Sequence, residues 1–283
     1  MTGFKSDQPI NAARPRARDT LALRVGSAAI LAPAALAASW IGGPVFAGLV
    51  AFLCVLMAFE WARMIEGAET STVFYALGAA SAAALTLAAA EYYAFAFLAA
   101  GAGGVGAYAF TRNSDRRLWA AFGAAFFIAP AIALLWLREE NAQGGGLTIL
   151  LFAIVWAADT GGYFGGRLVG GPKLNPAISP AKTWAGAAGG MLFGAAAAAI
   201  AGPQFLGWQH GLSALAVGGG LGLASIVGDM AESAIKRRFG VKDMSGFIPG
   251  HGGVLDRLDG MIFATAAMTA ALSVNSLFAG AQG

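Results

Sequence analysis

Long apolar segments alternate with short polar ones along most of the chain. In a bilayer an α-helix satisfies its own backbone hydrogen bonds, whereas an open strand leaves them unpaired. A helix of about 20 apolar residues is long enough to cross the hydrocarbon core. The pattern therefore predicts an all-α, polytopic membrane bundle with about nine spans, at residues 24–41, 43–62, 72–90, 92–110, 117–137, 147–166, 183–201, 211–231 and 257–278.

The basic residues fall almost entirely on one side of this predicted bundle. If the N-terminus is cytoplasmic, every one of the 18 Lys and Arg residues except Arg138 lies in a segment on the cytoplasmic side. Such an asymmetry is typical of the positive-inside rule for membrane proteins. We therefore expect a cytoplasmic N-terminus and a periplasmic C-terminus. The basic residues on the cytoplasmic side account for the net charge of +3. The charge is therefore read as a topology signal, and no nucleic-acid partner is expected.

Composition supports a membrane protein and divides the chain into regions. Only 12% of the 283 residues are charged, against about 25% in soluble domains. The single cysteine, Cys54, excludes an internal disulfide and a cysteine-based metal site. We divide the chain into a basic cytoplasmic arm (1–23), N-terminal membrane helices (24–137) in which we find no candidate chemistry, and a C-terminal membrane region (138–283) that carries the candidate chemistry.

Four polar clusters gather in that C-terminal region, and the predicted topology places all of them at the cytoplasmic face. The second cluster is expected to be a turn that leads into a helix. In chain order the clusters are WAADTGGYFGGRLVG (156–170), ISPAKTWAG (178–186), GDMAESAIKRRFG (228–240) and KDMSGFIPGHGGVLDRLDG (242–260).

Four aspartates in these clusters are the candidate metal and substrate ligands. Asp159 and Asp229 interrupt apolar helices, and a charge inside the bilayer costs about 2.5–3.5 kcal/mol, so such residues normally face a cavity. Asp256 and Asp259 are spaced i, i+3 and share one helix face. Carboxylates from two helices suit Mg²⁺, which also binds phosphate oxygens and water. The structural alternative for Asp159 and Asp229 is a snorkelling or helix-capping Asp. For Asp256 it is an N-cap or helix-dipole partner, and for Asp259 it is pairing with Arg257 or a helix-end role.

Glycines and cations in the same clusters are candidate phosphate contacts. The glycines of PGHGG allow backbone N–H groups to approach a phosphate, and basic side chains can hold further anionic oxygens. For the basic residues, the alternative is a loop that rests on anionic lipid. His251 is an acid, a ligand or a polar turn residue. The candidate substrate contacts are Asp159, Ser179, Lys182, Thr183, Lys236, Arg237, Gly252, Gly253 and Arg257. The candidate catalytic residues are Asp229, Asp256, Lys242 and His251.

Residues 233–260, SAIKRRFGVKDMSGFIPGHGGVLDRLDG, resemble the signature of the phosphatidate cytidylyltransferase (CDP-diacylglycerol synthase) family. GDMAES resembles the family's Gly-Asp-x-x-Glu-Ser, and SPAKTWAG resembles its Ser-Pro-Lys-Lys-Thr-Trp-Glu-Gly, with departures at Ala181 and Ala185. The matching fixed positions of the signature are Ser233, Lys236, Arg237, Lys242, Asp243, His251, Gly252, Gly253, Asp256, Arg257 and Asp259.

The resemblance implies an enzyme that transfers CMP from CTP to phosphatidic acid and releases CDP-diacylglycerol and pyrophosphate. It implies Mg²⁺ dependence and allows a second cation. It also implies a bacterial inner-membrane location, a cytoplasmic site and a homodimer. By motif position Asp229 and Asp256 carry over as the metal-binding pair, with Asp259 as a further candidate ligand. Two alternatives stay open: a transferase acting on another membrane lipid, and a transporter, which would need midplane charges in both halves.

Overall fold

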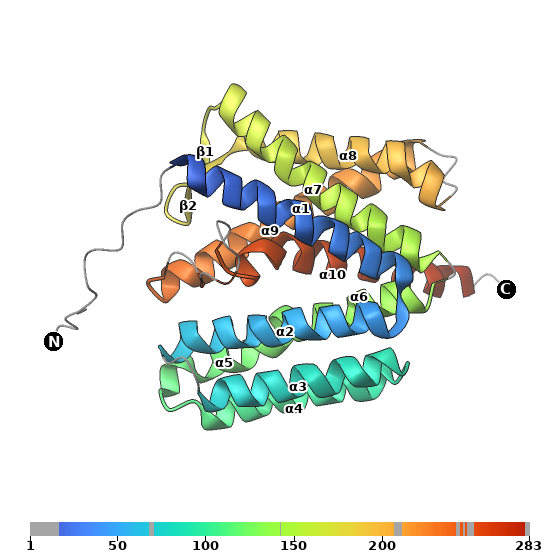
Figure 1. The fold of residues 1–283 in the computed structure, drawn as a ribbon. Coiled ribbons are helices and arrows are strands. Elements are labelled where there is room, and N and C mark those ends of the chain that lie inside the picture. The colour runs from blue at the N-terminus through green and yellow to red at the C-terminus, as the bar shows by residue number, and fades with distance from the viewer. Residues whose placement is uncertain are drawn as a thin grey trace.

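The computed structural model describes residues 17–67, 71–141, 143–206, 211–241, 244–245, 247 and 252–280. These residues form nine helical rods and one short β-hairpin, shown in Figure 1. In chain order the elements are α1 (Ala17–Ile41), α2 (Gly43–Glu66), α3 (Thr72–Ala89), α4 (Tyr93–Phe110), η1 (Ser114–Arg116), α5 (Arg117–Gly123), η2 (Ala124–Ile128), α6 (Ala129–Glu139), α7 (Gly144–Leu168), β1 (Lys173–Asn175), β2 (Ser179–Thr183), α8 (Trp184–Leu206), α9 (Gly211–Arg238) and α10 (Leu255–Gly280).

The helices run roughly along one common direction in two groups (Figure 1). In the first group α2 packs on α3 and α3 on α4, with the continuous rod of α5, η2 and α6 beside them. In the second group α7 packs on α8, α8 on α9 and α9 on α10. Contacts of α10 with α6 join the groups, and α1 lies against α2 and α7. The described residues of the four polar clusters lie on the second group and on the hairpin beside it.

The predicted all-α membrane fold is confirmed. Seven helices in the described part of the chain are long and apolar enough to cross a membrane. Helix α1 contributes a shorter apolar stretch, Val25–Ile41, and α10 coincides with the ninth predicted span. Helix α9 extends beyond the predicted end at residue 231, which places Glu232 and Lys236 on the same helix as Asp229. Which end of the bundle faces the cytoplasm stays a prediction.

Arg138 links the end of α6 to the end of α1, opposite the polar clusters. Its Nε atom donates a hydrogen bond to the carbonyl of Ser39 at 2.5 Å, and its Nη2 atom donates to that of Trp40 at 3.0 Å. The neighbouring Glu139 accepts a hydrogen bond from the Gly43 amide at 2.8 Å. The end of α6 therefore lies against the α1–α2 connection, as expected if the connections after the first and fifth predicted spans lie on the same side of the membrane.

Small residues let the helices of the second group approach closely. A Cβ atom added to Gly194 of α8 would lie 2.7 Å from the carbonyl oxygen of Gly218 on α9. Real Cβ atoms do not approach an oxygen so closely, so the two backbones are in direct contact.

The predicted turn at residues 178–186 is wrong in its secondary structure. Residues 179–183 form strand β2, which pairs antiparallel with β1 through Lys173 opposite Thr183 and Asn175 opposite Ser179. Helix α8 begins directly afterwards, at Trp184. The hairpin places Lys182 beside Asp229 of α9.

Candidate functional site

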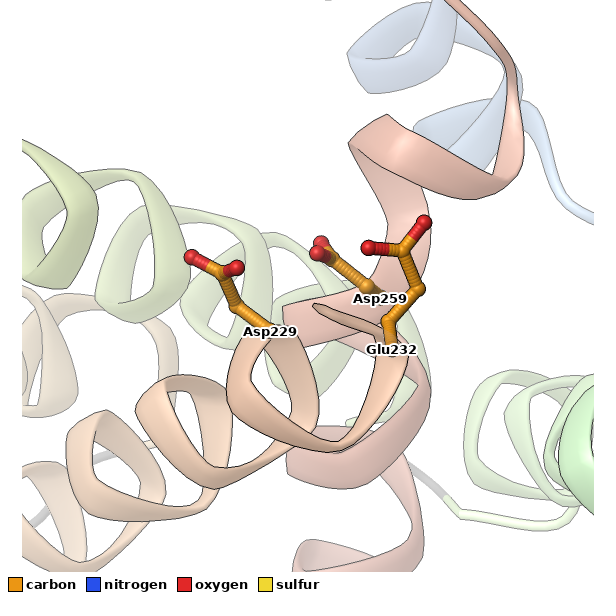
Figure 2. A group of neighbouring side chains, drawn as sticks. All are labelled: Asp229, Glu232 and Asp259. Carbon is orange, nitrogen blue, oxygen red and sulfur yellow. The ribbon is translucent and has the colours of Figure 1, made fainter. Parts of the chain in front are cut away.

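Three carboxylates from two helices converge beside the hairpin. Asp229 and Glu232 lie one turn apart on α9, and Asp259 projects from α10 toward them (Figure 2). One carboxylate oxygen from each lies within 4.8 Å of the others. Glu232 is buried, whereas the Asp229 side chain is 42% exposed. The group is therefore open toward Asp229 and closed behind Glu232.

Two lysines compensate part of the negative charge. The Nζ atom of Lys182, on β2, lies 2.5 Å from Oδ2 of Asp229. The Nζ atom of Lys236, one turn beyond Glu232 on α9, lies 2.5 Å from Oε2 of Glu232 and 2.7 Å from Oδ1 of Asp256. Lys236 thus joins α9 to the first turn of α10, and Lys182 joins the hairpin to α9.

Asp256 contacts the backbone that leads into α10 as well as Lys236. Its Oδ2 atom accepts hydrogen bonds from the amides of Gly253 at 2.9 Å and Met244 at 3.1 Å. Gly252 adopts a φ of +86°, which L side chains rarely adopt. Asp256 lies in the first turn of α10, as the helix-dipole alternative predicts, but it is not the N-cap, because the amides that it accepts from precede the helix. Asp256 lies beside the group of three carboxylates rather than within it.

Glu60 of α2 is a site residue that the sequence analysis missed. It lies in the N-terminal helices, where no chemistry was expected, and it has no exposed surface. Its carboxylate accepts hydrogen bonds from the amides of Val254 at 2.9 Å and Leu255 at 2.8 Å, and from the Ser245 hydroxyl. The available signal was a single carboxylate inside the apolar run LMAFEWA, which is costly unless it has partners.

A large open pocket of about 1650 Å³ connects these groups to an apolar wall. Its polar floor is formed by Asp159, Lys182, Asp229, Glu232, Lys236, Asp256, Arg257 and Asp259. Its wall consists of aliphatic and aromatic side chains of α1 and α2, among them Leu31, Leu49, Phe52, Leu53 and Leu56. One pocket therefore offers surroundings for charged oxygens and for hydrocarbon chains.

Some of the remaining predicted site residues line the pocket, one bonds to the backbone beside it, and two lie outside the described residues. Asp159 and Arg257 line the pocket. Thr183 also lines it, and its Oγ1 atom accepts a hydrogen bond from the Gly186 amide at 3.0 Å, so it caps α8 as well. Arg237 donates from Nε to the carbonyl of Ile178 at 3.4 Å, next to Ser179 at the start of β2. Lys242 and His251 lie outside the described residues, so their predicted roles stay predictions.

The donor set of the carboxylate group suits a divalent cation. Hard cations such as Mg²⁺ prefer carboxylate oxygens combined with water and phosphate oxygens. Among the described residues, none donates a hydrogen bond to the buried Oε1 atom of Glu232. A buried carboxylate oxygen without a donor is costly unless a cation or another polar group satisfies it. The residues present therefore fit a metal ion, whose identity the geometry leaves open.

Comparison with known proteins identifies the family. A model described as the cytidylyltransferase family matches residues 22–275. The phosphatidate cytidylyltransferase of Brucella suis is 36% identical over 256 residues, which cover 87% of this chain and 91% of that protein. That of Pseudomonas aeruginosa is 37% identical over 156 residues, or 54% of this chain and 58% of that protein. That of Synechocystis is 42% identical over 130 residues, or 45% and 44%.

These matches confirm the resemblance that the motifs indicated. The family model spans most of the chain, and the Brucella protein aligns with nearly all of it. The chain therefore belongs to the cytidylyltransferase family and is a membrane enzyme of that type.

Proposed function

We propose that the enzyme transfers CMP from CTP to phosphatidic acid and releases CDP-diacylglycerol and pyrophosphate. The observation that carries this proposal is the composite pocket, in which a floor of carboxylates and cations adjoins an apolar wall. A nucleoside triphosphate needs the first kind of surface, and the acyl chains of a lipid phosphate need the second. The names of the curated relatives support the same pair of substrates.

We propose Mg²⁺ as the metal, held by Asp229, Asp259 and Glu232. Asp256 also stays in the proposed set of metal ligands. The ammonium group of Lys236 lies between Asp256 and Glu232. A second cation would bind between the same two carboxylates, in place of that ammonium group. When bound, Mg²⁺ would neutralise triphosphate charge and stabilise the pyrophosphate leaving group.

The chain's own residues would position the two substrates. Lys182 and Arg257 lie at the pocket floor, where their positive charges can hold phosphate oxygens. Lys182 is paired with Asp229, so it also fixes that carboxylate. Phosphoryl-type transfer needs mainly alignment and electrostatic stabilisation, and phosphatidate brings its own nucleophilic oxygen. We therefore propose direct, in-line displacement at the α-phosphorus, without a covalent enzyme intermediate.

The stereochemical course tests this mechanism. With CTP that carries a chiral α-thiophosphate, one displacement should invert the configuration at phosphorus in the CDP-diacylglycerol product. The configuration is read from the phosphorus NMR spectrum of the product. Net retention would require two displacements and would contradict the direct mechanism, pointing instead to a nucleophile on the enzyme such as His251.

We also propose that the pocket faces the cytoplasm of a bacterial inner membrane, because nearly all basic residues fall on that side. CTP is a cytoplasmic nucleotide, so this orientation agrees with the proposed substrate. We also propose that the enzyme forms a homodimer, as the resemblance implies.

A comparison of nucleotides and lipids tests the proposed substrates. Purified enzyme in detergent with Mg²⁺ should release pyrophosphate with CTP and phosphatidic acid, and at least about a hundredfold more slowly with ATP, GTP or UTP. Omitting the lipid should stop the release. Equal activity with a polyprenyl phosphate, or activity without any lipid, would contradict phosphatidate as the acceptor and favour a different lipid transferase.

A further inference from the structure

Glu60 connects the N-terminal helices to the start of the helix that carries the site. Its Oε1 atom accepts hydrogen bonds from the Val254 amide at 2.9 Å and from the Ser245 hydroxyl. Its Oε2 atom accepts one from the Leu255 amide at 2.8 Å. Leu255 is the first residue of α10. A single side chain of α2 therefore holds both the first residue of α10 and the segment before it.

We propose that Glu60 is a positioning residue for the transfer reaction, fixing α10 so that Asp256 and Asp259 face α9. The inference rests on the proposed function, since it names the reaction that the residue serves. The first N–H groups of a helix have no partner inside the helix. A carboxylate placed there satisfies them and interacts favourably with the helix dipole. Helix α10 is thus anchored at the end where its carboxylates lie.

Asp256 shares this task, which makes the arrangement sensitive to the loss of Glu60. Asp256 already accepts the amide hydrogen bonds of Gly253 and Met244 while it pairs with Lys236. Without Glu60, the amides of Val254 and Leu255 would be buried and unpaired, a costly state. Asp256 is bonded to the Gly253 amide and directly follows Leu255 in the chain, so a shift of this segment would move it. Its movement would break the ion pair with Lys236 and change the carboxylate group on α9.

The close approach at Gly253 shows how tightly the two carboxylates enclose this peptide. A Cβ atom at this position would lie 2.7 Å from Oε1 of Glu60 and 3.0 Å from Oδ2 of Asp256. Real Cβ atoms essentially never come within 3.0 Å of another heavy atom, so a larger residue here would displace the Glu60 carboxylate and crowd that of Asp256. The motif glycine therefore serves the packing of two carboxylates in addition to any contact with phosphate.

Three variants separate positioning from simple structural support. Glu60→Gln keeps the size but turns one oxygen acceptor into a donor that faces backbone N–H groups. Glu60→Asp keeps the charge on a shorter side chain and serves as the conservative rescue. Trp61→Phe is the matched control, because it removes a buried hydrogen bond, from Nε1 to the Trp119 carbonyl at 3.0 Å, from the next residue of the same helix. That bond leads to α5 and not to α10.

The measurements are amide hydrogen exchange in peptides covering residues 252–258, and kcat and KM for CTP and phosphatidate. In Glu60→Gln we expect exchange of these amides to become at least about tenfold faster. We expect kcat to fall about 10- to 100-fold, as when outer contacts of a metal site are removed, with KM for CTP little changed. Glu60→Asp should recover part of kcat. Trp61→Phe should change neither quantity, even if it lowers Tm.

Each outcome decides the proposal. Unchanged exchange in Glu60→Gln, or an unchanged kcat per folded molecule, would overturn it. A loss of activity in Glu60→Gln that only follows the loss of folded protein would make Glu60 a structural residue. A wild-type enzyme that shows no activity with CTP and phosphatidate would instead overturn the proposed function, and this inference with it; the wild-type assay therefore distinguishes the two failures.

Discussion

Replacing Asp229 by Asn should reduce the rate of CMP transfer about a thousandfold or more, the scale expected when a central electrostatic group of a site is lost. Asp229 belongs to the group of three carboxylates and lies 2.5 Å from Lys182. Asparagine keeps the shape of the side chain but removes its charge, so both the proposed metal ligand and the partner of Lys182 are lost. The initial rate of lipid product, measured across a Mg²⁺ titration, tests this prediction.

The fold should survive the same substitution. The Asp229 side chain is 42% exposed, and ion pairs of that exposure contribute little to stability. Asp115→Asn is the matched control, because Asp115 lies on η1, outside the residues that line the pocket. It should keep near-normal activity. Near-normal activity of Asp229→Asn at every Mg²⁺ concentration would contradict the assignment of Asp229 as a metal ligand.

Replacing Asp256 by Asn is the second large effect, a fall of about a hundredfold or more in kcat. Its carboxylate accepts hydrogen bonds from Lys236, Gly253 and Met244. Asparagine cannot balance the charge of Lys236, and its NH₂ group would face a backbone donor in one of its two orientations. We expect the Mg²⁺ concentration for half-maximal activity to rise as well, because Asp256 is in the proposed metal-binding set.

The Mg²⁺ titration also separates two roles of Asp256. If kcat falls while the Mg²⁺ requirement stays at the wild-type value, Asp256 acts only through Lys236 and the start of α10. An Asp256→Asn variant with wild-type kcat and Mg²⁺ requirement would show that neither role matters. Asp115→Asn again provides the control for the loss of one carboxylate charge.

Local spacing explains which parts of the site the sequence could predict. Asp229 and Glu232 are separated by three residues on one helix, and so are Asp256 and Asp259, so each pair shares a helix face. The helices themselves follow from apolar runs long enough to cross the bilayer. Glu232, the glutamate of GDMAES, received no metal role, because the sequence does not show which carboxylates of α9 and α10 face each other. That depends on the rotation of the helices about their axes.

Contacts between distant segments explain the rest. Glu60 and Val254 are separated by 194 residues, and only the packing of α2 beside the start of α10 brings them together. No periodicity within either segment predicts such a pair. The hairpin was missed for a related reason: its strands are three and five residues long, too short for an alternating pattern to separate them from a turn. The position of Lys182 beside Asp229 depends on that hairpin.

The central claim is that this pocket transfers CMP, rather than a single phosphoryl group, to phosphatidic acid. The most direct measurement supplies CTP labelled with ³²P at either the α- or the γ-phosphate and follows the label after lipid extraction. The α-label should enter the lipid fraction as CDP-diacylglycerol, and the γ-label should leave entirely as pyrophosphate. The γ-label in the lipid, or neither label there while phosphatidate is present, would contradict the account.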